Sequence, residues 1–157
     1  MTPLEILKDL TDRFKQDIVG VFEKSPKRIY IEIKKEALVR VVLHVFRELG
    51  ARFNTASGVD VRDHMEMLYH FTFDKIDAVF TFRIKLDKSN LEIDSLTPYF
   101  EGANWIERET TEVLGITFKN HPDMRRLLLP EDWPEGVYPL RRDYKEWDKN
   151  AIRDRGV

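Results

Sequence analysis

The first residues of the chain alternate between apolar and polar side chains with the spacing of an amphipathic helix. Apolar residues stand three or four positions apart as far as Phe14, which places them on one helical face. Thr2 and Pro3 mark the start, because a threonine side chain caps a helix and proline fits its first turn. The residues expected on the apolar face are Leu4, Ile6, Leu7, Leu10 and Phe14.

Residues 18–87 carry the patterns of several strands and one further helix. Two apolar runs flank Ser25-Pro26, and isoleucines at every second position of the later run predict an amphipathic strand. Residues 35–50 have helical apolar spacing and end at Gly50, a residue type that commonly follows a helix. Three more strands are predicted, within residues 51–62, 65–74 and 77–87.

A second clear helix is predicted between Asn104 and Gly115. Its start has the spacing of a capping box, in which the Asn104 side chain accepts from the N–H of Glu107 and Glu107 reaches back. The residues that follow, as far as Tyr144, are interrupted by prolines and show no regular period. They are predicted to form an irregular segment.

This order of elements predicts an α+β fold. We expect a mixed, mainly antiparallel sheet with helices packed on one side and an irregular, interface-forming C-terminal segment. Residues 1–120 would form the α+β core, and residues 121–157 an extended segment that packs on a partner subunit. No repeat or linker divides the chain, so a single domain is expected overall.

Composition narrows the possible functions. The chain has 157 residues and no cysteine, which excludes thiolate zinc sites, cysteine nucleophiles and iron–sulfur clusters held by the chain itself. Charged residues make up 34% of the sequence, yet the net charge is only −2, so nucleic-acid binding is not favoured. Such dense, balanced charge is typical of heat-adapted proteins. Neither a signal peptide nor a membrane-spanning run is expected.

The histidines do not predict a metal site. His44 lies beside an apolar helical stripe and is interpreted as structural. His64 and His70 share one face of a predicted strand, but about 20 Å of strand separates them, too far for one ion. His121 precedes Pro122 and has no second histidine nearby. No glycine-rich phosphate loop is present either.

The region from Glu107 onwards combines carboxylates, arginines and large aromatic residues. Glu107 and Glu109 stand two positions apart, so they do not face each other on a helix, and ion pairing with arginine is favoured over acid–base chemistry. Arginine with tryptophan and tyrosine is the composition of protein–protein interfaces. An ordinary solvated surface is the alternative. The residues concerned are Arg108, Arg125, Arg126, Arg141 and Arg142, with Trp105, Trp133, Tyr138, Tyr144 and Trp147.

The run "ERETTEVLGITFKNHPDMRRLL", residues 107–128, resembles the signature of the complex I 30 kDa subunit family, also called the C subunit of NADH:quinone oxidoreductase. "LYHF", "ANW" and "PLRRDY" resemble the family too, so the likeness covers roughly residues 28–145. Thr110, Thr111 and Glu112 stand where the family usually has an aromatic residue and an aspartate, and Asn120 replaces its usual glycine. The short, charged chain resembles the equivalent subunit of membrane-bound nickel–iron hydrogenases more than the respiratory one.

The resemblance implies a non-catalytic subunit, without a cofactor of its own, in the hydrophilic arm of a membrane-bound complex I-like oxidoreductase. The implied partners are the large hydrogenase-like (49 kDa-type) subunit and a small subunit that carries [4Fe–4S] clusters. The implied location is peripheral, on the cytoplasmic side of the membrane. The predicted interface residues are Glu107, Arg108, Glu109, His121, Asp123, Arg125, Arg126, Trp133, Arg141, Arg142 and Tyr144. The alternative is a stand-alone enzyme with Glu109 and His121 as its acid–base pair.

Overall fold

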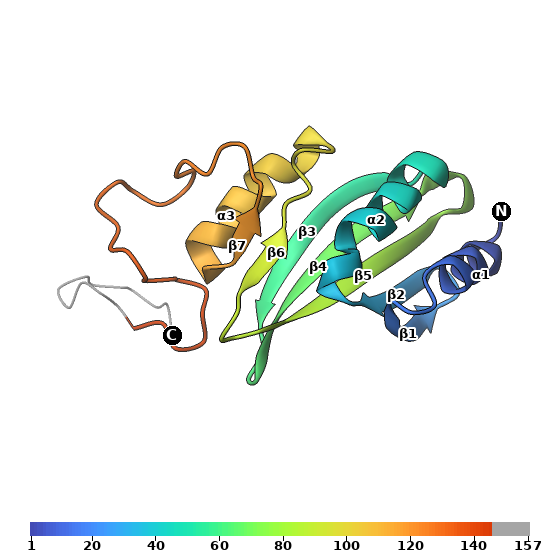
Figure 1. Ribbon diagram of the computed structural model, residues 1–157, viewed down its shortest axis with the longest axis horizontal. Helices are drawn as coiled ribbons and strands as arrows, with labels where there is room; N and C mark the ends of the chain where they lie inside the picture. Colours follow the sequence, from blue (N-terminus) through green and yellow to red (C-terminus); the bar gives the residue numbers. More distant parts are fainter. Residues whose placement is uncertain (146–157) are drawn as a thin grey trace, which may run out of the picture.

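A five-stranded sheet forms the centre of the protein, as the computed structural model shows (Figure 1). The structure describes residues 1–145, and residues 146–157, which the sequence analysis assigns to the C-terminal segment, lie outside the described residues. The strands are β1 (Ile18–Ser25), β2 (Arg28–Ile33), β3 (Arg52–Asp60), β4 (His64–Phe73) and β5 (Ala78–Asp87). Their order across the sheet is β1-β2-β5-β4-β3.

The sheet is mixed because one of its pairs is parallel. β1 with β2, β3 with β4, and β4 with β5 are antiparallel, whereas β2 and β5 run parallel. A parallel pair needs a long connection, and here the chain between β2 and β5 contains a helical segment and the β3–β4 hairpin. The predicted α+β class with a mainly antiparallel sheet is therefore confirmed.

Helix α1 (Pro3–Arg13) begins as predicted. The Thr2 hydroxyl accepts from the Glu5 N–H at 3.2 Å, and the Glu5 carboxylate accepts from the Thr2 N–H at 2.7 Å. Ile6, Leu10 and Phe14 are buried, but the prediction for Leu4 is wrong, since Leu4 is 67% exposed. Leu4 stands two positions before Ile6, which is about 200° around a helix and therefore on the opposite side.

The helix predicted over residues 35–50 changes its geometry along its length. A 3₁₀ turn (Lys35–Ala37) leads into α2 (Leu38–Leu43), and a π-helical turn (His44–Glu48) follows. His44 is buried, with Nδ1 2.8 Å from Arg13 and Nε2 2.6 Å from Asp9. It therefore ties this helical segment to α1, which agrees with its interpretation as structural.

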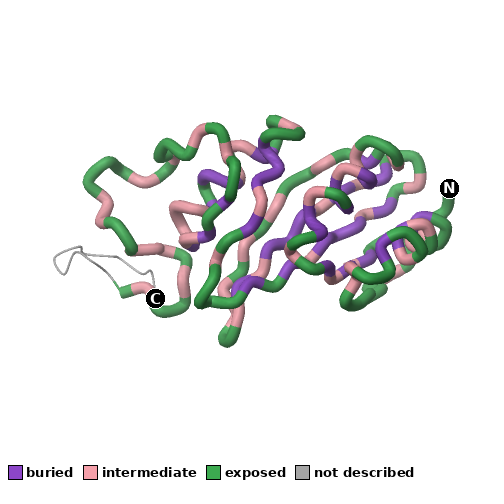
Figure 2. The backbone as a smooth tube through the Cα atoms, in the orientation of Figure 1, coloured by how far each residue is buried: buried purple, intermediate pink, exposed green. Residues whose placement is uncertain are grey.

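The core lies between the sheet and the helices on one face. Figure 2 shows the buried backbone running through the middle strands and α2. Aromatic rings from β4 and β5 meet edge to face in this layer, with Phe71 and Phe82 at 5.9 Å between centroids and Phe73 and Phe80 at 5.2 Å. Ile29, Ile31 and Ile33 of β2 point into the same core, as their alternation predicts.

The opposite face of the sheet carries paired charges. Glu32 on β2 lies 3.0 Å from Lys85 on β5, and Glu66 on β4 lies 3.5 Å from Arg83 on β5. The His64 Nε2–H donates to the same Glu66 carboxylate at 2.9 Å, and this hydrogen bond raises the pKa of His64. Part of the chain's dense charge is thus used in pairs that cross neighbouring strands.

Helix α3 and a small second sheet pack beside β3. α3 spans Asn104–Leu114, and β6 (Glu92–Asp94) pairs in parallel with β7 (Thr117–Lys119). The sequence analysis does not predict this pair, because each strand has only three residues. At Gly58 of β3, an added Cβ would stand 2.4 Å from Leu114 of α3. The missing side chain is what allows α3 to lie this close to the sheet.

Candidate functional site

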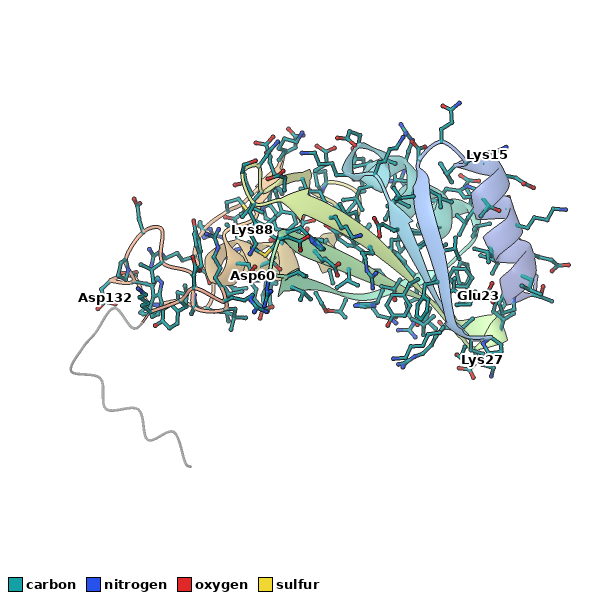
Figure 3. The ribbon with its side chains drawn as sticks, turned by 90° about the horizontal axis from the view of Figure 1, so that it is seen from below. Lys15, Glu23, Lys27, Asp60, Lys88 and Asp132 are labelled. Carbon is teal, nitrogen blue, oxygen red and sulfur yellow. The ribbon has the colours of Figure 1, made fainter. Side chains whose placement is uncertain are left out.

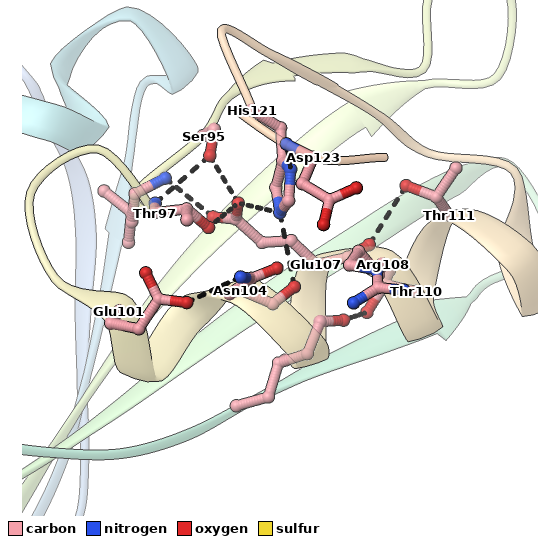
Figure 4. Close-up of polar contacts among 12 residues, drawn as sticks. Ser95, Thr97, Glu101, Asn104, Glu107, Arg108, Thr110, Thr111, His121 and Asp123 are labelled. Atoms are coloured by element: carbon pink, nitrogen blue, oxygen red, sulfur yellow. Dashed lines mark hydrogen bonds and ion pairs between the residues drawn. The ribbon is translucent and has the colours of Figure 1, made fainter. Parts of the chain in front are cut away.

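Helix α3 does not start with the predicted capping box. Ala103 is the N-cap residue, Asn104 is already helical, and the Asn104 side chain donates to Glu101 (Figure 4). Glu107 turns instead to the loop after β6, where its carboxylate accepts from the Ser95 hydroxyl, the Leu96 N–H and the Thr97 hydroxyl. The prediction is wrong because these donors, ten to twelve residues earlier in the chain, satisfy Glu107 in the fold.

The position of Glu107 along α3 could have revealed its burial. It stands three residues before Thr110 and seven before Leu114, and all three are buried, so it belongs to the helix's inner stripe. Glu107 itself is 1% exposed. Burial raises the pKa of Glu107, against the opposing effect of the hydrogen bonds from Ser95, Leu96 and Thr97. Its side chain is therefore an internal link and is not available to a partner in this conformation.

His121 is buried beside the carboxylate of Glu107. Its side chain is 0% exposed, and its Nε2 lies 3.8 Å from the Glu107 carboxylate. The Asp123 N–H donates to Nδ1, so Nε2 carries the ring proton and points at the Asn104 carbonyl at 3.3 Å. His121 thus fastens the chain that leaves β7 to the start of α3.

The alternative acid–base pair is not assembled. Glu109 is exposed on α3, whereas the ring of His121 is buried against Glu107. Within residues 1–145, no hydrogen bond or ion pair joins Glu109 to His121. Glu109 also forms no ion pair with an arginine in that range, contrary to our expectation.

Arg108 and Glu112 hold the main chain of the irregular segment against α3. Arg108 is buried, and it donates to the carbonyls of Arg125 and Arg126 at 2.8 and 2.9 Å. Glu112 accepts from three successive amides, those of Leu127, Leu128 and Leu129. These contacts satisfy main-chain groups of residues 125–129 within the chain, without a partner. Glu112 is also a residue that the predicted interface omits, although it belongs to the motif.

Arg141, late in the irregular segment, binds the C-terminal end of α3. The Arg141 Nε donates to the Leu114 carbonyl at 2.7 Å, and its guanidinium lies over the Tyr138 ring. A cation at this point offsets the negative end of the helix dipole. Gly115 has φ +74°, and an added Cβ would stand 2.5 Å from Arg141. Gly115 therefore both ends the helix, as predicted, and makes room for Arg141.

The other predicted interface residues close local turns of the segment. Arg126 donates to the carbonyls of Pro130 and Trp133, and the Trp133 indole donates to the Val137 carbonyl. Trp133 stacks on Tyr144 with 6.3 Å between centroids. Asp123 and Arg125 pair at 2.7 Å, and the Arg125 guanidinium lowers the pKa of Asp123. Arg142 is exposed, and its N–H donates to Asp60.

Large apolar side chains project from this ordered segment. Leu128 is 59% exposed, Leu140 is 65% exposed, and Met124 is also exposed. Trp105, on the first turn of α3, is exposed as well. The main chain at Leu128 and Leu140 is held against α3 by hydrogen bonds to Glu112 and to the Val113 carbonyl. We call Met124, Leu128 and Leu140, together with the exposed Arg125 and Arg126, the segment surface.

Two further observations concern cofactors and membranes. Across residues 1–145, no group of three or more histidine, aspartate or glutamate side chains is arranged to hold a metal ion. In the same part of the chain, every helix is too short or too polar to cross a bilayer.

Comparison with protein families gives a match over residues 31–150. The matching family is described as "Respiratory-chain NADH dehydrogenase, 30 Kd subunit". The match spans most of the chain and includes α3 and the segment held against it. It confirms the resemblance seen in the motif at residues 107–128.

Individual relatives agree with the family match. The C subunit of the F(420)H(2) dehydrogenase of Methanosarcina mazei is 34% identical over 152 residues, which are 95% of this chain and 96% of the relative. The C/D subunit of the NADH-quinone oxidoreductase of Pectobacterium carotovorum is 34% identical over 129 residues, covering 82% of this chain but 19% of that longer protein. A chain of the membrane-bound sulfane sulfur reductase, an archaeal respiratory membrane complex, shares the fold with a TM-score of 0.77 at 16% identity, covering 96% and 95% of the two chains.

The raised pKa of Glu107 predicts a pH-dependent stability. The folded state keeps the carboxyl proton to a higher pH than the unfolded state does, so this contribution is complete below the unfolded pKa and lost as pH rises through the folded one. Glu107→Gln removes the titration. We expect the free energy of unfolding of the wild type, relative to this variant, to fall with rising pH in urea titrations from about pH 4 to about pH 8. Parallel curves for the two proteins would contradict this.

The Glu112 carboxylate should control local opening of the segment. Glu112→Gln leaves one acceptor oxygen and turns an amide NH₂ towards the N–H groups of Leu127, Leu128 and Leu129. Since hydrogen bonds to a charged group contribute about 1.5–3 kcal/mol, we expect these amides to exchange with deuterium at least about tenfold faster. Glu109→Gln, at an exposed position of the same helix, is the matched control and should leave their exchange unchanged.

Alanine substitutions at Gly115 and Gly136 distinguish the cost of backbone strain from the cost of losing the Arg141 contact. Both have φ +74°, but an added Cβ meets Arg141 and Tyr138 at Gly115 and nothing within 4 Å at Gly136. Gly136→Ala should cost about 1–2 kcal/mol for the left-handed backbone alone. Gly115→Ala should cost more, as measured by the denaturant midpoint. Equal costs would show that Arg141 moves aside freely.

Proposed function

Because this chain belongs to the family of the 30 kDa subunit of the respiratory-chain NADH dehydrogenase, we propose that it is a non-catalytic assembly subunit of a complex I-like oxidoreductase. Family membership makes it a subunit of the respiratory and hydrogenase-related complexes. Its own task would be to hold the large hydrogenase-like subunit beside the electron-transfer module. The segment surface would be the part that meets the partner.

The proposal rests on one observation: side chains of the same polypeptide hold the main chain of the irregular segment against α3. Arg108, Glu112 and Arg141 bind main-chain groups of the segment and of α3 within the free chain. A surface ordered beforehand loses less conformational entropy when a partner binds. Exposed leucines and methionine on such a surface favour protein contact over solvent.

The large hydrogenase-like subunit is the favoured partner. The relative from Pectobacterium carotovorum is named as a C/D subunit, and this chain matches 19% of its length. Formate hydrogenlyase subunit 5 of Escherichia coli is likewise much longer than the matched part, which is 26% of it. A C-type and a D-type unit joined in one polypeptide stay close by necessity, which supports the same neighbours here as separate chains.

The proposal also covers the iron–sulfur clusters, the location of the chain and the substrate of the parent complex. A small partner subunit would carry the [4Fe–4S] clusters, because this chain has no cysteine to bind one. The chain would lie at the cytoplasmic side of the membrane and reach the membrane arm only through its partners. One structural relative is a chain of a membrane-bound sulfane sulfur reductase, so the substrate of the parent complex need not be NADH or hydrogen.

Two exposed leucines test the interface. Leu128→Asp combined with Leu140→Asp should reduce co-purification of the large subunit at least about tenfold, because charge on an apolar contact leaves a desolvated carboxylate unpaired. Leu4→Asp is the matched control, since Leu4 is as exposed (67%) but lies on α1. Arg141 is unsuitable for this test because it caps α3.

The readout is the amount of large subunit that the tagged full-length chain captures from a co-expressing cell. The free energy of unfolding of each variant serves as the folding control, since surface changes usually cost little stability. Capture by the double variant at the wild-type level would remove the segment surface from the interface. Failure of the wild type to capture the large subunit would overturn the proposed function itself.

A further inference from the structure

A cationic hollow lies where the tip of the β3–β4 hairpin meets the end of the segment. Its volume is about 280 Å³. Figure 3 shows two of its residues, Asp60 and Lys88, beside α3. The lining residues are Asp60, Arg62, Met65, Lys88, Leu91, Arg141, Arg142 and Asp143. Cations therefore outnumber carboxylates in this hollow, although the chain as a whole is slightly acidic.

The Asp60 carboxylate is already paired with groups of the same chain. The side chain of Asp60 is 4% exposed, its Oδ1 lies 2.6 Å from the Lys88 amino group, and its Oδ2 accepts from the Arg142 N–H at 2.9 Å. Burial alone would raise the pKa of Asp60, but the contacts with Lys88 and Arg142 outweigh it and the pKa is lowered. Lys88 also donates to the Arg62 carbonyl. Asp60 thus holds together the three chain segments that make the hollow.

Within residues 1–145, two guanidinium groups of the hollow make no hydrogen bond. Arg62 and Arg142 take part in hydrogen bonds there through main-chain atoms, and none engages either guanidinium. Arg141 differs, because its Nε binds the Leu114 carbonyl. Exposed guanidinium groups of this kind bind planar anions in a bidentate manner.

The rest of the lining consists of the carboxylate of Asp143 and two apolar side chains, Met65 and Leu91. Met65 is buried at 1% exposure and Leu91 is partly buried. Leu140, next in sequence to Arg141, is exposed, as is Val59 beside Asp60. A free inorganic anion would use only the cationic side of this hollow. A glutamate side chain has both parts that the hollow offers to bind, an aliphatic stem and a carboxylate.

We propose that this hollow binds a glutamate side chain of the partner polypeptide. Its methylene groups would pack on the partly buried Leu91, and its carboxylate would pair with Arg62 and Arg142 and approach the amino group of Lys88, which lines the same hollow. The inference rests on the proposed function, since the glutamate would belong to the large subunit. It adds a charged contact to the apolar segment surface, and such a contact fixes orientation as well as adding affinity.

Lys88 gives a direct chemical test, because a carbodiimide joins an amine to a carboxylate in contact with it. In the free full-length chain, the expected product links Lys88 to Asp60, which confirms that the reagent reaches the hollow. In the purified complex with the large subunit, mass spectrometry should find Lys88 linked to an acidic residue of that subunit. Lys88→Arg keeps the charge and should retain the complex but lose both products.

Substitution of Arg62 and Arg142 gives the second arm. Arg62→Gln with Arg142→Gln should weaken capture of the large subunit at least about tenfold at low salt, and the loss should shrink as salt screens the pair in the wild type. Lys24→Gln with Arg28→Gln removes the same charge from exposed positions on β1 and β2 and should leave capture unchanged.

The outcomes separate the two proposals. If Leu128→Asp with Leu140→Asp abolishes capture, while the Arg62 and Arg142 variant captures normally or no Lys88 product forms with the large subunit, the hollow is not the contact and the proposed function stands. If the wild type captures no large subunit, both proposals fail. If Arg62 and Arg142 instead bind the full-length chain to vesicles of anionic phosphatidylglycerol, the glutamate assignment is overturned.

Discussion

The arrangement of the C-terminal half depends on hydrogen bonds from α3 side chains to main-chain groups of other segments. An irregular segment has no helix or sheet to satisfy its N–H and C=O groups, so other partners must do so. Glu107, Arg108 and Glu112 provide them to stretches before and after the helix. Buried charges are costly unless several hydrogen bonds compensate them, and each of these side chains makes at least two. Polar side chains of α3 therefore hold both the segment before the helix and the segment after it.

Charge elsewhere in the molecule plays a smaller part. The pairs Glu32–Lys85 and Glu66–Arg83 lie on the uncovered face of the sheet, where water and salt screen them. Lys85 is exposed, whereas Glu32, Glu66 and Arg83 are partly buried, and contact with solvent reduces what such pairs contribute to stability. The same residue types therefore have different roles on the two sides of the protein. On the sheet they keep an uncovered face soluble, and on α3 they determine the path of the chain.

The strands of the five-stranded sheet and the first helix could be predicted because their patterns are local. The alternation of Ile29, Ile31 and Ile33 and the Thr2 cap before Pro3 are visible within a few residues, and the fold has both. The role of Glu107 could not be read in the same way. Asn104 and Glu107 also have capping-box spacing, and only the fold brings Ser95 and Thr97 close enough to compete for the carboxylate. The motif indicates the correct helix, but it does not distinguish the residues that are buried, such as Glu107 and Arg108, from those that are exposed, such as Glu109.

The two places where the segment is fastened leave a stretch between them that is closed by its own contacts. Arg108 and Glu112 fix residues 125–129, and Arg141 fixes the other end at Leu114. Between them, Arg126 donates to the carbonyls of Pro130 and Trp133, the Trp133 indole donates to the Val137 carbonyl, and Trp133 stacks on Tyr144. Insertions or deletions in that loop would leave both attachment points in register, whereas a one-residue deletion between β7 and Asp123 would pull His121 away from α3. Natural length variation among homologous chains should therefore accumulate in the loop and be rare ahead of it.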